Sequence, residues 1–387
     1  MENKNAHFHF LKDYHYAPEA AVGGNRVQTL CDGPQVFKAI LESIKGARHQ
    51  IALEFYTFAS DQTGQRVLQA LVARAKKGVK VRLIYDGIGS LWTDPSFFTP
   101  LRQASGEVQV FHPPYPWNSG WSWKKRDHRK LLIVDDAYVL IGGLNISDHY
   151  SLSPEKGGFH DLALSIEGPV SQQAWKIFER SWNRSVWPLA LRLDAGIEST
   201  VLKNNGDTFV EIVGNDHLRD RWNIRRRMIY AISKARSSVY IINPYFLPDL
   251  GLTRALKKAV ERGVSVQILI PNKSDTPIVD LASIVTQRKL LKRGVKVYRW
   301  PGMLHAKVVL VDSVWFSIGS YNFDHLSLFE NLEIVANAID PGSGNTLSMI
   351  IEKDLHAAKE MFLEDLRSLP WWKRILSRFF YSLRRFL

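Results

Sequence analysis

A motif that occurs twice constrains this chain more than any other feature. The pattern H-x-K-x4-D, with a glycine 14 residues and an asparagine 17 residues after the histidine, occurs in each half of the sequence. The first copy consists of His128, Lys130, Asp135, Gly142 and Asn145, and the second of His305, Lys307, Asp312, Gly319 and Asn322. Two copies with matched downstream residues are not expected by chance, so the sequence indicates an internal duplication that carries a site.

Each histidine opens a run of alternating or continuous apolar residues, which predicts a β-strand. On a strand, His305 and Lys307 share one face because side chains alternate with a period of two. Taken alone, that pair also fits a strand end with a buried histidine and a lysine directed to water. The second copy favours a shared site. Asp135 and Asp312 stand at the far ends of their strands, where capping a turn is the simpler interpretation.

The duplication extends upstream of the motifs. Residues 46–90 read as strand, helix and strand, and residues 234–275 repeat that order. Gly78 and Gly263 follow the predicted helices, in the position where glycine ends a helix. Alternating strands and helices predict an α/β fold of two duplicated lobes, each a mixed, mostly parallel sheet flanked by helices and related to the other by a pseudo-twofold axis. Such an axis brings the two motifs face to face.

The predicted organisation has three parts. The helical pattern is lost and Pro, Gly and Asn accumulate near residues 190–205, so a first lobe is expected over 1–195 and a second over 205–369. Residues 370–387 form a basic, aromatic tail. The single cysteine, Cys31, excludes an intrachain disulfide. We expect neither a signal peptide nor a spanning helix, because no charged segment precedes an apolar core and no apolar run reaches about 18 residues.

Paired histidines suit the displacement of an alcohol from a phosphodiester. One imidazole can attack phosphorus as the free base while the other, as imidazolium, protonates the leaving oxygen. The attack would form a phosphohistidine, to be discharged by water or by a second alcohol. Side chains that can hold the phosphate oxygens are Lys130, Asn145, Lys307, Ser320 and Asn322. Asp161 and Glu333 follow the two copies at comparable distances and are the expected orienting carboxylates, although each also fits a solvated strand edge.

These motifs resemble the phospholipase D superfamily and, within it, the bacterial cardiolipin synthases without amino-terminal membrane helices. The stretches that carry the resemblance are YDGIGS, DHRKLLIVDDAYVLIGGLN, HDLALSIEGPV and IGSYNFDHLSLFENLE. The resemblance implies transfer of a phosphatidyl group from phosphatidylglycerol to a second phospholipid or alcohol, without a metal ion or other cofactor. It also implies that Lys130 and Lys307 belong with His128 and His305 to the catalytic set, which in the motif includes Asp135 and Asp312, and we favour His128 as the nucleophile. His160 stands where related synthases often have arginine.

Charge and flanking segments bear on the substrate. A net charge of +13 indicates an anionic partner, either lipid or nucleic acid. As a helix, residues 370–387 place aromatic and aliphatic residues on one face and five cations on the other, a pattern typical of a helix on an anionic membrane surface, although such a helix can also pack on the core. Residues 111–126 combine aromatics with cations, which suits a headgroup interface, stacking on nucleic acid or an ordinary loop.

Three functions therefore remain open from the sequence. The first is a peripheral enzyme on the cytoplasmic side of the membrane that makes cardiolipin, with a nucleic-acid partner disfavoured. The second is a phosphodiesterase or nuclease of the same fold. The third is an inactive membrane-binding scaffold, which the intact His, Lys and Asn residues of both copies disfavour. The oligomeric state stays open, since a duplicated chain can complete its site alone.

Overall fold

The computed structural model describes residues 9–115, 124–186, 205–215, 220–272, 274 and 276–384. Its strands are β1 (Val22–Cys31), β2 (Gln50–Phe55), β3 (Lys80–Asp86), β4 (Glu107–Phe111), β5 (Lys130–Val134), β6 (Tyr138–Gly142), β7 (Leu162–Glu167), β8 (Thr208–Asn215), β9 (Ser238–Ile242), β10 (Ser265–Pro271), β11 (Lys296–Trp300), β12 (Val308–Val311), β13 (Trp315–Gly319), β14 (Glu333–Ile339) and β15 (Lys359–Met361). Its helices are α2 (Asp32–Gly46), α3 (Gln62–Ala75), α4 (Thr99–Gln103), α5 (Asp148–Ser151), α6 (Ser171–Val186), α7 (Asn223–Lys234), α8 (Leu250–Glu261), α9 (Pro277–Leu291), α10 (His325–Phe329), α11 (Pro341–Ala357), α12 (Leu363–Arg367) and α13 (Trp371–Ser382).

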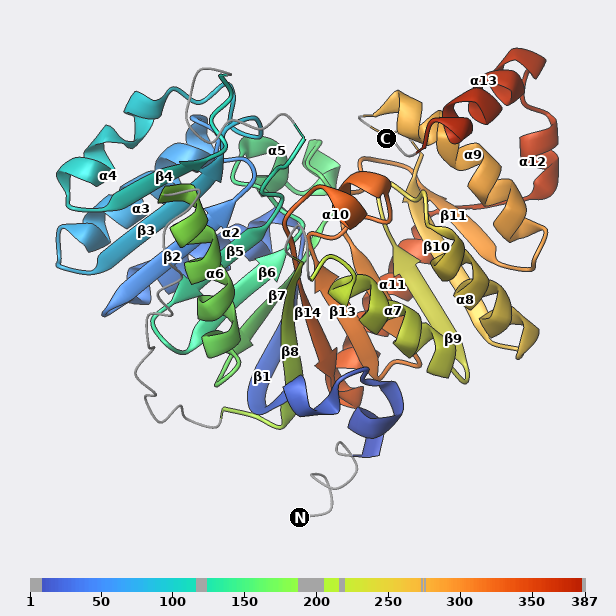
Figure 1. The fold of residues 1–387 in the computed structure, drawn as a ribbon, viewed down its shortest axis with the longest axis horizontal. Coiled ribbons are helices and arrows are strands. Elements are labelled where there is room, and N and C mark those ends of the chain that lie inside the picture. The colour runs from blue at the N-terminus through green and yellow to red at the C-terminus, as the bar shows by residue number, and fades with distance from the viewer. Residues whose placement is uncertain are drawn as a thin grey trace.

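The strand order confirms the duplication. One 15-stranded sheet runs β15-β11-β10-β9-β12-β13-β14-β8-β1-β7-β6-β5-β2-β3-β4. Read outward from the central pair β8–β1, each strand of the first half has a counterpart in the second, and β15 is an addition at one edge. Figure 1 shows the two halves side by side along the long axis. The expected pseudo-twofold relation is therefore present, but the halves share a continuous sheet instead of forming separate ones.

The expectation of mostly parallel sheets was wrong. Among the strand pairs of the described residues, only β2–β3, β3–β4, β9–β10 and β10–β11 are parallel. The strands that follow each histidine form the antiparallel meanders β5-β6-β7 and β12-β13-β14. Short turns such as residues 135–137 join β5 to β6, and connections of that length permit only antiparallel pairing. The βαβ pattern of the upstream segments does not extend through the motifs.

Helices cover both faces of the sheet (Figure 1). One apolar cluster lies between the sheet and helices α6 and α11 and extends through both halves. On the other face, α2 and α3 cover the first half, and α7 and α8 cover the second. The long apolar runs of β5, β12, β13 and β14 are buried throughout, as expected for strands with both faces covered.

The predicted lobe boundary near residues 190–205 lies almost wholly outside the described residues. On either side of it, α6 packs on the first half and β8 pairs with both β1 and β14. The division into lobes at 1–195 and 205–369 stays a prediction.

Candidate active site

The two histidines lie at the same edge of the sheet. His128 precedes β5, whose first residue, Lys130, pairs with Phe55 at the end of β2. His305 precedes β12, whose first residue pairs with Ile242 at the end of β9. β2 is parallel to β3, and β9 is parallel to β10. Each motif therefore begins where a strand of its half's parallel segment ends, which is the usual site of function in α/β sheets.

Backbone hydrogen bonds tie each histidine to the opposite half. The His128 amide donates to the carbonyl of Leu332 at 2.9 Å, and the His305 amide donates to the carbonyl of His160 at 2.8 Å. Isolated bridges Asp127–Leu332 and His160–Leu304 accompany them. The two histidines are therefore held by equivalent connections across the pseudo-twofold axis.

Each predicted carboxylate faces the histidine of the other half. Nδ1 of His128 lies 3.0 and 3.1 Å from the two oxygens of Glu333, and Nδ1 of His305 lies 2.8 Å from Oδ2 of Asp161. Both carboxylates are fully buried. A carboxylate only accepts, so each Nδ1 carries the proton and each Nε2 is left for chemistry. Nε2 of His128 has no hydrogen-bond partner in the described part of the chain, whereas Nε2 of His305 lies 3.3 Å from the hydroxyl of Tyr150.

The lysines of the motifs lie beside the histidines, and the asparagines bind neighbouring loop residues. Nζ of Lys130 donates to the carbonyl of His128 at 2.8 Å, and Nζ of Lys307 donates to the carbonyl of His305 and lies 2.9 Å from its Nδ1. Asn145 accepts the amide of Thr57 through Oδ1, which leaves its amide nitrogen as a donor. Oδ1 of Asn322 is buried and has no hydrogen-bond partner in the described residues, although its backbone amide donates to the hydroxyl of Ser327.

Burial changes the titration of these groups. The pKa of His128 is lowered by burial, which outweighs the opposing effect of Glu333. Burial also lowers the pKa of Lys130 to about 7 and raises the pKa of Asp161 to about 6, in the second case against the nearby Lys307. His128 is therefore suited to be a neutral base near pH 7, and a bound phosphate would favour the charged form of Lys130.

Ser320 contacts a carboxylate, and this corrects its expected role in holding phosphate. Its side chain is completely buried, its hydroxyl donates to Glu333, and it accepts the Ile334 amide at 3.0 Å. At the equivalent position of the first copy, a Cβ on Gly143 would lie 2.4 Å from the carboxylate of Asp161. The two motifs differ here because Asp161 fills the space that the serine occupies in the second half.

Asp135 and Asp312 lie outside the site, so the structure does not support their inclusion in the catalytic set. Both adopt left-handed backbone conformations with φ of 50° and 53°. Asp135 accepts the backbone amides of residues 48–50, and Asp312 accepts those of residues 236–238. They cap the segments that enter β2 and β9, which is the alternative role expected for them.

Several important residues were missed because no short motif marks them. Arg129, between His128 and Lys130, is buried and donates to Glu54 at 3.2 Å and to the carbonyl of Glu333 at 3.1 Å. Ser327, on α10, donates to Oε1 of Glu333 at 2.7 Å, whereas Ser320 donates to Oε2. A buried arginine needs an acidic partner, but Arg129 stands in the polar run of residues 126–130 just before β5, where one more charged residue does not indicate burial.

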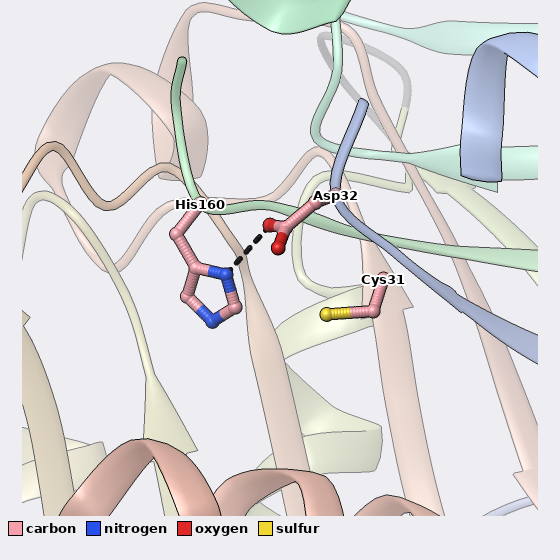
Figure 2. A group of neighbouring side chains, drawn as sticks. All are labelled: Cys31, Asp32 and His160. Atoms are coloured by element: carbon pink, nitrogen blue, oxygen red, sulfur yellow. Dashed lines mark hydrogen bonds and ion pairs between the residues drawn. The ribbon is translucent and has the colours of Figure 1, made fainter. Parts of the chain in front are cut away.

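His160 forms a cluster at the junction of the halves. Its Nδ1 lies 2.7 Å from Oδ1 of Asp32, and its Nε2 lies 2.8 Å from Oδ2 of Asp354 on α11. Figure 2 shows Asp32 and His160 facing each other, with Cys31 beside them. Cys31, Asp32 and His160 bring donor atoms within 4.8 Å of one another, the spacing of a metal-ligand group. Both ring nitrogens of His160 face carboxylates, however, so both donate and neither offers a lone pair to a metal.

This cluster predicts a pH-dependent contribution to stability. Burial opposes the charge on His160, but hydrogen bonds to Asp32 and Asp354 outweigh it and raise its pKa from 6.5 to about 10. Its charge therefore stabilises the fold fully below pH 6.5, and the stabilisation is lost as the pH rises through 10. In denaturant unfolding, the difference between wild type and His160→Gln should be largest near pH 6 and shrink towards pH 10. A constant difference would contradict the assignment, and His356→Gln, at an exposed histidine of α11, is the control.

The fold and the site together define a class. A duplicated sheet that presents two histidine–carboxylate pairs and two lysines at one edge is the arrangement of a phospholipase D-type enzyme, with the carboxylates exchanged between halves. Within the described residues, none of the helices has the length and apolarity needed to cross a membrane.

Comparisons with known proteins define the family. The family model described as "Cardiolipin synthase, PLD-like domain" matches residues 40–182 and 228–355. A cardiolipin synthase of Halalkalibacterium halodurans is 34% identical over 355 residues, covering 90% of this chain and 70% of that protein. The major cardiolipin synthase ClsA of Bacillus subtilis is 32% identical over 360 residues, covering 91% and 73%. The chain belongs to the cardiolipin synthase family of phospholipase D-like proteins, and it is a phosphatidyl transferase of that type.

Solved structures agree on the fold. The phosphatidylserine synthase of Haemophilus influenzae superposes with a TM-score of 0.71 at 13% identity, covering 99% of this chain and 100% of that one. A polyphosphate kinase of Porphyromonas gingivalis superposes with a TM-score of 0.54 at 12% identity, covering 86% and 50%. At such identities these likenesses concern the fold alone.

Proposed function

We propose that this enzyme makes cardiolipin from phosphatidylglycerol and a second phospholipid through a phosphatidyl-histidine intermediate. The observation that carries the proposal is the pair of buried carboxylates, Glu333 and Asp161, each bound to Nδ1 of a histidine from the other half. Two oriented imidazoles at one edge supply a nucleophile and a proton donor for the same phosphorus. The family relation supports a phospholipid as the substrate.

In the first half-reaction, Nε2 of His128 attacks phosphorus. Its proton sits on Nδ1, where Glu333 accepts it and stabilises the positive charge that develops on the ring. The bond from phosphorus to the glycerol oxygen breaks, and that oxygen takes its proton from imidazolium His305. The products are free glycerol and a phosphatidyl group on His128, with His305 neutral. The unoccupied Nε2 and lowered pKa of His128 favour it as the nucleophile.

In the second half-reaction, a hydroxyl of the acceptor lipid replaces glycerol. His305 now removes the hydroxyl proton, the oxygen attacks phosphorus, and the bond to Nε2 of His128 breaks. Cardiolipin leaves and both histidines regain their first protonation states. Throughout, Lys130, Lys307 and the amide groups of Asn145 and Asn322 would hold the non-bridging oxygens, so that no divalent metal is needed in our scheme.

We place the enzyme on the cytoplasmic side of the membrane as a peripheral protein. Its substrates would lie in that leaflet, and its excess of positive charge suits an anionic surface. A phosphodiesterase with water as acceptor is the second candidate, because the same intermediate can be hydrolysed.

The test is a lipid balance. Purified enzyme with phosphatidylglycerol vesicles and a chelator should release glycerol and form cardiolipin in equal amounts, both measured by mass spectrometry. Formation of phosphatidic acid and glycerol without cardiolipin would mean that the enzyme hydrolyses phosphatidylglycerol instead of transferring its phosphatidyl group. Dependence of the reaction on added magnesium or calcium would contradict the metal-free scheme. Cleavage of a nucleic-acid substrate, together with no turnover of lipid, would reject a lipid substrate.

A further inference from the structure

Large apolar side chains are exposed along the edge of the sheet that carries the two histidines. Leu91 and Trp92 follow β3, Ile278 follows β10 and Leu326 follows β13, and all four are exposed. Each of these strands ends on the side where the histidine of its half lies. β3 and β10 are parallel to β2 and β9, and β13 is antiparallel to β12, which begins just after His305. Trp92 is 93% exposed, which is a costly position for the largest apolar side chain unless something covers it.

Helix α13 presents its apolar stripe to solvent instead of to the protein. Trp372, Ile375 and Phe379 lie on consecutive turns and are 46%, 55% and 55% exposed. The helix docks through another side, where Phe380 packs near Val279 and the hydroxyl of Tyr381 accepts Nζ of Lys289 at 2.9 Å. A surface helix of a water-soluble protein normally buries such a stripe. The alternative that this helix packs on the core therefore holds for its contact with α9, but not for its apolar stripe.

The charges around this stripe are positive. Residues 370–387 contain no acidic residue, and the exposed Arg374 and Arg378 flank the stripe. On the other side of the site, the exposed Lys124 and Lys125 precede His128. Of the predicted tail, Arg385 and the last two residues lie outside the described part, as do residues 116–123 of the aromatic segment.

The position of α13 connects this stripe with the site. Phe380 packs with Leu247 and Val279, which follow β9 and β10 at the edge where His305 lies. Figure 1 shows α13 and α10 along the same upper border of the molecule. Trp92 belongs to the first half and α13 to the second, so the exposed apolar groups flank the histidines on both sides.

We propose that this edge is a membrane-docking surface, with α13 lying in the headgroup layer of an anionic phospholipid bilayer and Trp92 as a second anchor. The choice of a bilayer over a protein partner rests on the proposed function and on charge complementarity. Docked in this way, the site faces phosphodiesters at the depth where they lie in the membrane. Both lipids then reach the histidines without leaving the bilayer.

The test is flotation of the full chain with phosphatidylcholine vesicles that contain or lack phosphatidylglycerol. Wild type should float with the anionic vesicles, and less at high salt. The double variant Ile375→Ser/Phe379→Ser and the variant Trp92→Ser should each bind at least about tenfold more weakly. The matched control is Met349→Ser, because Met349 is 71% exposed on α11, a helix that begins at the opposite edge.

Each outcome separates this inference from the proposed function. Failure of wild type to float, or an equal loss for Met349→Ser, would overturn the docking surface. The docking surface would also be overturned if the wild type formed dimers and the double variant were monomeric but floated as well as the wild type. Turnover of a water-soluble short-chain phosphatidylglycerol by wild type tests the site without a bilayer. Turnover without flotation would reject only the docking surface, and flotation without turnover in either form would reject only the proposed function.

Discussion

Replacing either His128 or His305 by alanine is expected to reduce phosphatidyl transfer at least about a thousandfold, because each removes a bond-forming or proton-transferring group. The two losses should not be additive, since the nucleophile and the acid act in one step. Transfer measured as cardiolipin formed from phosphatidylglycerol vesicles is the readout. The control is His356→Ala, at an exposed histidine of α11, which should retain full activity.

The variants also separate the roles of the two histidines. A phosphatidyl ester with a nitrophenol leaving group needs no protonation to depart, so His305→Ala should still form the phosphohistidine and release nitrophenol once. His128→Ala should release none. Mass spectrometry of protein denatured at alkaline pH would find the phosphatidyl group on His128. A group on His305 in the variant His128→Ala would reverse the assignment.

Replacing Arg129 by methionine is expected to lower the free energy of unfolding by about 3–5 kcal/mol, the usual cost of leaving a buried charge without its partner. Arg129 is 1% exposed and binds Glu54, which is fully buried. It also donates to the carbonyl of Glu333 and to the hydroxyl of Ser181 at 2.6 Å, so it holds parts of both halves. Denaturant unfolding monitored by fluorescence measures the change.

Two further variants distinguish lost charge from lost packing. Arg26 and Glu167 form an exposed ion pair at 2.6 Å, so Arg26→Met should cost no more than about 1 kcal/mol. In the double variant Glu54→Leu/Arg129→Met the uncompensated carboxylate is gone, and part of the lost stability should return. If the double variant is as unstable as the sum of the single ones, Arg129 acts through packing and not through its charge.

A proton near Arg129 bears on the same experiment. Burial and the neighbouring Glu54 raise the pKa of Asp127 well above its usual value. One oxygen of Asp127 and one of Glu54 are buried without a hydrogen-bond partner in the described residues, and a proton between the two carboxyl groups would satisfy both. Arg129 then neutralises a carboxyl pair that carries one negative charge.

The sequence predicted the duplication and most of the site because the motif fixes spacing along a strand. His128, Lys130, His305 and Lys307 come together at one edge, since residues two apart on a strand share a face and both strands start at equivalent places. The exchange of Asp161 and Glu333 between halves was not predicted. It depends on how the halves pair, and hydrophobic patterns within one half contain no information on that pairing.

Other features were beyond sequence reasoning for identifiable reasons. The first two strands after each histidine are antiparallel because only residues 135–137 and 312–314 join them, which is too short for a crossover, whereas the upstream βαβ pattern predicts parallel strands. Ser320 was assigned to phosphate because hydroxyls bind phosphate, whereas the buried Glu333 beside it is a closer acceptor. For residues 370–387, the sequence left open a membrane surface or the core as the partner of the apolar face, since amphipathicity does not say what that face contacts.

The exchange of carboxylates makes the proposed site depend on both halves of the chain. Glu333 reaches His128 and Asp161 reaches His305 only while the two halves are joined through β1 and β8. If the proposed mechanism holds, a chain with one half unfolded has no assembled histidine pair and should be inactive. In the proposed mechanism, discharge of the intermediate by water would consume membrane lipid, so this dependence on both halves would restrict the reaction to intact chains.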